Sequence, residues 1–367
     1  MRRNDALIRN LQSAMLEPQI LHPIRVRLLA PMETLIYPEA LAAMAAFPAF
    51  DSWIKFAANI YGFPVYRFAA EENAEVLGLL ALVHIKHFMF GNYLTTAPFA
   101  SYGGLAFSSV DVRDALLEKA YELRRDLGAD YVNVRFDAGE SIPPLGWVRH
   151  PIYSTYRADL SSDSEAMLAL YSSDHRNHIR KSLKKGFSVN FGHLDLLDDV
   201  YEGLARSMHE LGSPYHGKIY LRAMAESLGN ALEFAVVRGP HGELAGAGVF
   251  ILQGKVVTNL HANILHKFRS DYAGEFLYWS VITRYAEKGF AVFDIGRSLI
   301  GSGNETFKLK WKPHKQLLAY WYALKPGSTT PELNQKNPRF QFAIWLWKHL
   351  PDFIVRPLGP LFIKGLA

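Results

Sequence analysis

One order of structural elements occurs twice along this chain, and it constrains the fold more than any other feature of the sequence. Each half carries apolar strands, a glycine-containing loop, a helix that ends at a glycine, and a further strand. In the first half the helix is expected to be capped by Asp111 and to end at Gly128, and in the second half it covers residues 275–287 and ends at Gly289. The two copies lie about 165 residues apart, a period that predicts the duplication of one domain.

The strands are indicated by their periodicity. Residues 131–136 alternate, with Val132, Val134 and Phe136 on one face, as in a half-buried strand. Other apolar runs of strand length occur at 76–90, 234–237, 246–252, 256–261 and 290–295. The predicted fold class is therefore α+β.

The length of 367 residues is enough for two domains, each with its own core. We place the first domain at 1–158 and the second at 159–325, with a mainly helical stretch at 161–225. The motif-bearing second domain is expected to hold the active site. The sequence KPGSTTP after Leu324 begins a third segment, residues 326–367, which is expected to be a linker and an amphipathic helical tail.

Composition excludes several kinds of site. The chain has no cysteine, so disulfides, thiolate metal sites and cysteine nucleophiles are excluded. Its 40 Lys and Arg against 35 Asp and Glu leave a net charge of +5, which allows anionic substrates without requiring nucleic acid. Among the 14 histidines, two pairs lie three residues apart, but no third ligand follows at a matching offset: His84 and His87, and His175 and His178. We therefore expect no metal site and no bound cofactor.

The chain contains no uninterrupted apolar stretch of the ~20 residues that a membrane-spanning helix needs. The expected location is the cytoplasm, with the inner face of the membrane as a candidate site of attachment. Residues 338–367 carry several aromatic side chains beside basic ones. This tail either lies at a membrane interface or packs on the second domain, and the sequence leaves both alternatives open.

Residues 173–186 are strongly basic. On a helix Arg176, Arg180 and Lys184 lie at intervals of four residues and form one cationic ridge, with Lys181 and Lys185 beside it. Like charges at this spacing repel each other, and a bound phosphate would offset that cost. The alternative is an ordinary solvated helix face.

A second polar segment covers residues 293–312. Asp294 lies in an otherwise apolar strand and needs a partner, for which Arg297 is the nearby candidate. The pair either takes part in catalysis or is a buried structural ion pair. Lys308, Lys310 and Lys312 alternate with apolar residues, which predicts a strand with one cationic face.

The loop LGSPYHGK, residues 211–218, carries Ser213, His216 and Lys218. His216 could act as a general base, although an ordinary turn would have the same composition. The sequence has no serine nucleophile elbow, no Walker phosphate loop and no Rossmann glycine fingerprint.

Four segments together resemble one family: PFASYGG at 98–104, HRNHIRKSLKKG at 175–186, the loop at 211–218, and FDIGRS followed by GSGNETFKLKW at 293–311. The chain is similar to FemAB-related proteins from about Ala58 to the tail, and within them to the branch associated with exosortase/PEP-CTERM and exopolysaccharide loci. The resemblance implies two tandem domains of the GNAT acyltransferase fold. It also implies an enzyme that transfers an acyl group to an amine, with aminoacyl-tRNA as donor and a peptidoglycan precursor as acceptor in the best-known members.

The resemblance maps the family's motifs onto Phe307, Lys308 and Trp311, onto Arg176, Arg180 and Lys181, and onto residues 293–298. For an acyltransferase we assign roles to individual residues as a hypothesis. Lys308 would stabilise the oxyanion or a donor phosphate, Asp294 and Arg297 would orient the site, and His216 or a group of the substrate could take the proton. Arg176, Arg180 and Lys181 would hold a phosphate, and Tyr278 and Trp311 would form a wall. The remaining candidates for substrate binding are Ser213, Lys218, Asn259, Ser298 and Lys310.

Two departures from the family pattern affect these expectations. The branch tends to read FKK-x-W-G, whereas here Lys312 follows Trp311. The loop at 266–274 lacks the glycine pattern with which CoA-dependent GNAT enzymes hold pyrophosphate, which favours aminoacyl-tRNA over acyl-CoA as the donor. The alternatives are a CoA- or acyl-carrier-protein-dependent N-acyltransferase and a non-catalytic module that binds an anionic glycan or lipid-linked precursor.

Overall fold

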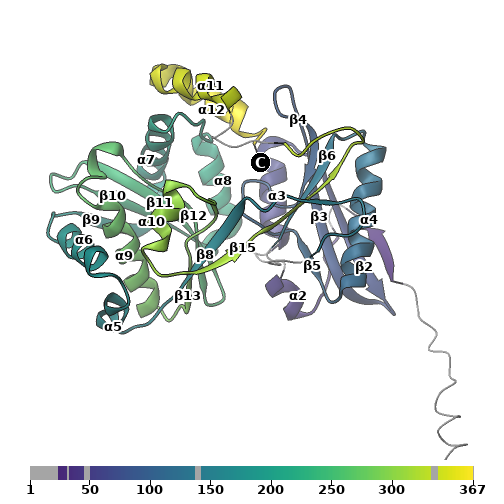
Figure 1. Cartoon of the computed structure of the whole chain (residues 1–367), viewed down its shortest axis with the longest axis horizontal. Helices are drawn as coiled ribbons and strands as arrows, with labels where there is room; N and C mark the ends of the chain where they lie inside the picture. The colour runs from purple at the N-terminus through teal and green to yellow at the C-terminus, as the bar shows by residue number, and fades with distance from the viewer. Residues whose placement is uncertain (1–23, 31–32, 45–49, 137–141, 332–337, 367) are drawn as a thin grey trace, which may run out of the picture.

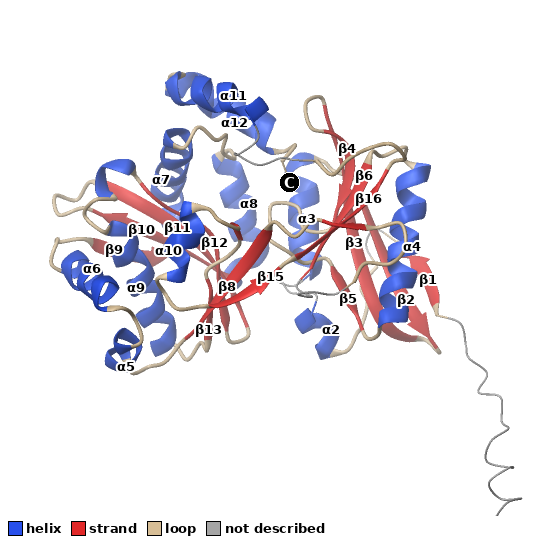
Figure 2. Ribbon diagram, in the orientation of Figure 1, coloured by secondary structure: helices blue, strands red, loops and turns tan. Residues whose placement is uncertain are grey.

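The computed structural model describes residues 24–30, 33–44, 50–136, 142–331 and 338–366. Two eight-stranded sheets lie side by side, each with helices packed on it (Figures 1 and 2). This arrangement confirms the predicted α+β class and the expectation of two tandem domains.

The first sheet has the order β1-β2-β3-β4-β6-β16-β7, and β5 pairs with β3. Its strands are β1 (Arg25–Leu28), β2 (Val65–Glu72), β3 (Glu75–His87), β4 (Gly91–Thr95), β5 (Leu105–Phe107), β6 (Tyr131–Phe136), β7 (Val148–Arg149) and β16 (Ala319–Leu324). Along β3 the buried side chains alternate between two clusters, as the two-residue period of a strand requires. One cluster contains α4 (Val110–Asp126), and the other contains α3 (Phe50–Tyr61) and a residue of α2 (Glu39–Met44).

The second sheet has the order β14-β8-β13-β12-β11-β10-β9, and β15 pairs with β8. Its strands are β8 (Tyr153–Asp159), β9 (Ser188–Gly192), β10 (Leu232–Arg238), β11 (Leu244–Gln253), β12 (Val256–Ile264), β13 (Val292–Asp294), β14 (Ser298–Leu299) and β15 (His314–Leu317). Packed on it are α5 (Ser164–Ala169), α6 (Ser173–Leu183), α7 (Leu197–Glu210), α8 (Lys218–Leu228), α9 (Ala273–Glu287) and α10 (Gly303–Leu309). α9 with α5 and α6 belongs to one buried cluster, and α7 with α8 belongs to another.

The duplication is visible in the strand directions. In the first sheet β4 pairs in parallel with β6, and α4 connects them. In the second sheet β12 pairs in parallel with β13, and α9 connects them. The other pairs around them are antiparallel, so each half of the chain builds the same unit. The helix of the first unit is capped by Ser109, whose side chain accepts from Val112 N, and not by Asp111 as predicted.

The two units exchange strands at their ends. β8 lies within the predicted first domain, 1–158, except for its last residue Asp159, but pairs in the second sheet. β16 lies within the predicted second domain, 159–325, but pairs with β6 in the first sheet. The division by sequence therefore differs from the division by sheets at both boundaries. A shared core reinforces the connection, since Phe56 of α3 packs against Tyr220 of α8 with ring centroids 5.2 Å apart.

The C-terminal segment is helical, as predicted. It forms α11 (Pro338–His349) and α12 (Asp352–Ile363), which lie along one edge of the molecule (Figure 1). In the part of the chain that the structure describes, no helix is both long and apolar enough to cross a bilayer.

Candidate functional site

Asp294 ends β13 and is completely buried. Its carboxylate accepts hydrogen bonds from Thr155 Oγ1 at 2.7 Å, from Tyr102 OH at 2.7 Å and from Gly296 N at 2.8 Å. Arg157 Nε lies 3.4 Å away and supplies the opposite charge. A buried carboxylate is tolerated only with such partners. One of them, Tyr102, comes from the segment between β4 and β5 of the first sheet.

Arg297 is not the partner of Asp294, so that expectation was wrong. Arg297 Nη1 donates to Tyr320 OH at 2.6 Å, and its guanidinium lies 4.9 Å from the centre of the Tyr153 ring. Tyr320 OH donates in turn to the carbonyl of Ser101. The turn at Gly296 directs the Arg297 side chain away from Asp294, and both residues are tied to the 98–104 segment. This segment was noticed in the sequence for its resemblance, but nothing local indicated its contacts.

Lys308 lies on helix α10 and not on the strand predicted for 307–312. Ser302 caps this helix by accepting from Glu305 N at 3.2 Å, and the three-residue spacing of Ser and Glu is a helix-start signal. Helical geometry places Lys308 inward, 3% exposed, while Leu309 is 43% exposed. The three lysines therefore do not share one face.

The ammonium of Lys308 is held by two backbone carbonyls. Its Nζ donates to Gly296 O at 2.8 Å and to Arg297 O at 2.7 Å. Burial lowers the pKa of Lys308 to about 7, because the effect of Asp294, which raises it, does not compensate for desolvation. Gly296 makes this turn with φ +82°, and a Cβ there would lie 2.8 Å from Asn259 O.

Glu305 is a second buried carboxylate beside this lysine, and sequence analysis missed its role. It accepts from Tyr156 OH at 2.6 Å and from Lys315 Nζ at 2.7 Å. Desolvation would raise its pKa, but Lys315 and Tyr156 hold the pKa at about 2. Tyr156 also lies beneath Lys308, with Nζ 5.7 Å from the ring centre. Glu305 thus fixes α10 and with it Lys308.

Tyr278 and Trp311, predicted as a wall, stack on each other with centroids 5.7 Å apart. Asn259 Nδ2 donates to Tyr278 OH at 2.9 Å. Three polar atoms of predicted binding residues are buried without a hydrogen-bond partner in the described part of the chain: Asn259 Oδ1, Ser298 Oγ and Trp311 Nε1. Such atoms cost about 1–3 kcal/mol each when left unpaired, and a hydrogen bond from water or from a polar ligand would remove that cost.

The basic ridge of α6 is only partly as predicted. Arg180 and Lys181 are exposed on the helix surface. Arg176 instead donates to the carbonyls of Ala169 at 3.4 Å and Tyr171 at 2.6 Å, so its guanidinium holds the preceding turn. Arg180 and Lys181 remain candidates for phosphate binding.

The surroundings of His216 are aromatic and buried, unlike those of a typical general base. It stacks on Tyr220 with centroids 3.6 Å apart, and its Nδ1 shares a 2.6 Å hydrogen bond with Tyr61 OH. Complete burial holds its pKa well below the usual value, and His261 adds to this. Tyr220 belongs to the α7–α8 cluster, whereas Tyr156 beneath Lys308 belongs to the α9 cluster. The structure therefore does not bring His216 together with Lys308.

The other two residues of the 211–218 loop are also apart from Lys308. Lys218 is exposed and pairs with Asp198 at 3.0 Å. Ser213 is half-buried, and its hydroxyl donates to Pro214 O at 3.4 Å.

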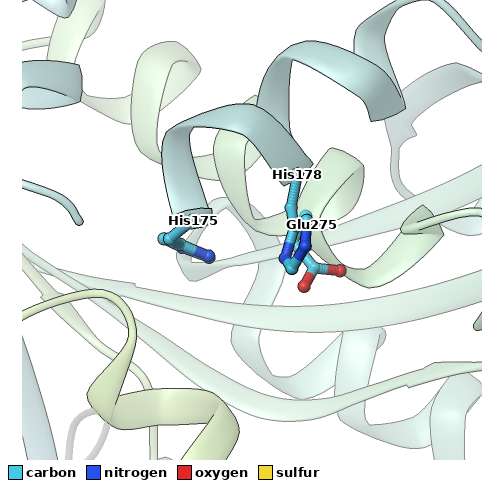
Figure 3. Close-up of side chains that lie close together, drawn as sticks. All are labelled: His175, His178 and Glu275. Carbon is cyan, nitrogen blue, oxygen red and sulfur yellow. The ribbon is translucent and has the colours of Figure 1, made fainter. Parts of the chain in front are cut away.

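Tertiary structure brings a third residue to one of the histidine pairs. His175 and His178 of α6 lie beside Glu275 of α9, with one ligand atom of each residue within 4.8 Å of the others (Figure 3). Lys310 Nζ lies 3.6 Å from Glu275 Oε1, so the carboxylate already has a cationic partner. Burial and Lys310 lower the pKa of His175 to about 4. We describe this cluster as an ion pair flanked by two histidines.

Comparisons with known proteins agree with the architecture. Residues 173–309 match the acetyltransferase (GNAT) domain family. The chain is similar to FemX, with 13% identity, a TM-score of 0.61, and coverage of 80% of this chain and 97% of FemX. A tandem GNAT protein from the clavulanic acid biosynthesis pathway is also 13% identical, with a TM-score of 0.52 and coverage of 84% and 100%.

A third similar structure is the C-terminal domain of a putative lysylphosphatidylglycerol synthetase from Agrobacterium fabrum. It is 13% identical, with a TM-score of 0.50 and coverage of 77% of this chain and 88% of that domain. No curated protein matches the sequence. At these identities the structural likenesses establish the fold, and the domain match establishes the class of enzyme. The chain is an acyltransferase with two GNAT-like domains.

Proposed function

We propose that this acyltransferase forms an amide on an amine-bearing cell-envelope precursor, with aminoacyl-tRNA as its donor. The observation that carries the proposal is Lys308, a buried amine held on two carbonyls beside Asp294, where the two halves of the chain meet. Attack of an amine on an activated ester needs alignment, removal of one proton, and stabilisation of the tetrahedral oxyanion.

Lys308 suits two of these tasks. Its charged form stabilises the oxyanion or a donor phosphate in a site that excludes water. Because the pKa of Lys308 is lowered to about 7, part of the population is neutral near physiological pH and can accept the proton of the attacking amine. This transfers to Lys308 the proton-accepting role that sequence analysis assigned to His216.

The start of α9 favours aminoacyl-tRNA over acyl-CoA as donor. In CoA-dependent GNAT enzymes the pyrophosphate lies at a helix N-terminus. Here Glu275 lies in the first turn of α9 and is 6% exposed. α6 packs over the same turn, with the rings of His178 and Tyr272 stacked 4.3 Å apart. A carboxylate and a covering helix both oppose a pyrophosphate at this position.

The acceptor is proposed from three features. Asn259, Ser298 and Trp311 offer unpaired polar atoms to a polar ligand, and the exposed Arg180 and Lys181 suit an anionic group. The motifs resemble the exosortase-associated branch of FemAB-related proteins, so an exopolysaccharide-related acceptor stands beside a peptidoglycan precursor.

The test is a single-turnover transfer assay. The purified protein meets radiolabelled, charged bulk tRNA in one reaction and acetyl-CoA in another, each with a cell-envelope precursor extract. We expect transfer from tRNA, a decrease of at least about 100-fold in Lys308→Ala, and no change in Lys119→Ala, a surface lysine of α4. Transfer from acetyl-CoA alone would overturn the choice of donor. Tight binding of the extract without transfer would favour the non-catalytic alternative.

A further inference from the structure

The C-terminal helices and the β3–β4 hairpin lie at one edge of the molecule (Figure 1). Both carry large apolar side chains that are exposed. These side chains, which we call the apolar ridge, are Phe88 (81% exposed), Met89 (53%), Phe342 (70%), Trp345 (55%), Leu346 (41%), Phe353 (77%) and Leu361 (50%). A ring contact connects the two parts, since the centroids of Phe88 and Phe362 lie 6.1 Å apart. Soluble surfaces rarely gather so many exposed large apolar groups without a binding function.

The exposure follows the helical period. Phe342, Trp345 and Leu346 have the spacing of one face of α11. On α12, Phe353, the exposed Pro357 and Leu361 lie four residues apart along one line. Each helix therefore presents an outward apolar stripe.

The inner faces of the same helices are closely packed on the second domain. Gly212 lies so close to α11 that a Cβ there would meet the Ile344 backbone at 2.6 Å, and a Cβ on Gly359 would meet Tyr215 O at 2.5 Å. The ring nitrogen Nε2 of His209 donates a hydrogen bond to the carbonyl of Trp347 at 2.9 Å. Of the two alternatives for the tail, packing on the second domain therefore applies to the inner faces of α11 and α12, and their outer faces stay exposed.

The first domain holds the end of the tail. The ring nitrogen Nε2 of His87 lies 2.8 Å from Leu361 O, and Tyr93 OH donates to Gly365 O at 2.9 Å. Contacts with both domains hold α11 and α12 in place. The apolar ridge is therefore exposed in the folded protein and does not result from a detached tail.

The charge around the apolar ridge is basic. Residues 338–366 contain Arg339, Lys348, Arg356 and Lys364 against a single acid, Asp352. Arg356 pairs with Asp352 at 3.1 Å and with Glu202 of α7 at 2.8 Å, so the surplus positive charge of this segment comes from its other three basic residues. The hairpin adds the exposed Lys86. Basic residues near an anionic bilayer add attraction to the burial of aromatic side chains, and Trp favours the headgroup region.

We propose that the apolar ridge docks this protein on the surface of an anionic lipid bilayer, with α11 and α12 lying in the plane of the headgroups. Twelve residues give each helix a length of about 18 Å, too short to span the hydrocarbon core. The basic composition and the protruding aromatic side chains favour a lipid surface over a second copy of the chain, which would carry the same positive charge.

The test is cosedimentation of the full chain with vesicles of phosphatidylcholine, alone or mixed with phosphatidylglycerol. We expect binding to the mixed vesicles that weakens with salt. Trp345→Glu/Phe353→Glu should weaken it at least about tenfold, because two inserted rings are lost and two repelled charges are added. Phe88→Ser/Met89→Ser, in the hairpin of the other domain, should weaken it independently.

The matched controls are Ile36→Glu and Leu145→Glu, which change apolar side chains that are 96% and 104% exposed outside the apolar ridge. Both should bind as the unchanged protein does. Circular dichroism checks that each variant is folded. Absence of binding to the mixed vesicles, or equal weakening by the controls, would overturn the proposal. A concentration-dependent dimer that Trp345→Glu/Phe353→Glu dissociates, without vesicle binding, would assign the surface to a second copy instead.

Discussion

Replacement of Lys308 by methionine keeps most of the side-chain volume but removes the amine. Lys308 is 3% exposed, and burial lowers its pKa from 10.5 to about 7. The unfolded chain keeps the ordinary pKa, so between these two values it binds a proton that the folded chain does not. The free energy of unfolding of the unchanged protein therefore rises with pH across this window, and the Lys308→Met variant lacks that contribution.

The size of the effect follows from the shift. At 1.36 kcal/mol per pKa unit, a rise from pH 6 to pH 9 stabilises the unchanged protein by about 3 kcal/mol relative to Lys308→Met. Urea denaturation of both proteins at several pH values measures this difference. Lys119→Met, at a half-exposed surface lysine, is the control and should show no such dependence. A difference that stays constant with pH would mean that Lys308 remains charged throughout, which would refute both the shifted pKa and its proposed role as a proton acceptor.

Two further substitutions test the geometry of the site. Tyr102→Phe removes the hydroxyl that donates to Asp294 at 2.7 Å. Because the carboxylate is fully buried, we expect the free energy of unfolding, measured by urea denaturation, to decrease by about 1–3 kcal/mol. An unchanged value would show that Tyr102 does not hold the two domains together at this point. Gly296→Ala places a Cβ 2.8 Å from Asn259 O at a φ of +82°. This variant should lower the free energy of unfolding by more than about 2 kcal/mol and should also lose transfer activity. Gly254→Ala is the control, since Gly254 also has a positive φ but a Cβ there would have no atom within 4 Å. It should lower the free energy of unfolding by about 1 kcal/mol or less. Equal decreases in the two alanine variants would contradict the close approach at Gly296.

Sequence patterns of short range predicted much of the fold. The helix at 275–287 lies within α9, and the strand at 131–136 is β6. Such elements depend on spacing and glycine positions within one segment, which the sequence shows directly. The duplication was predictable for the same reason, since each copy repeats these local patterns.

The segment 307–312 shows where local patterns mislead. Basic and apolar residues alternate there with the period of a strand, yet Ser302 and Glu305 begin a helix just before it. Burial of Lys308 against Gly296 and Arg297 then fixes the helix. Six residues are too few to distinguish the two periods, so tertiary contacts decided the outcome.

The sequence by itself determined the α+β repeat, the residue types available for acyl transfer, and the helical, aromatic and basic character of the tail. Only the tertiary structure decided which partners those residues have: Tyr102 reaches Asp294 from 192 positions away, and Glu275 joins a histidine pair of another helix. It also decided that β8 pairs in the second sheet and β16 in the first, and that the tail buries one face and exposes the other. The physical reason is that local patterns depend on the backbone period within one segment, whereas buried charges and exposed stripes depend on packing between segments far apart in the chain.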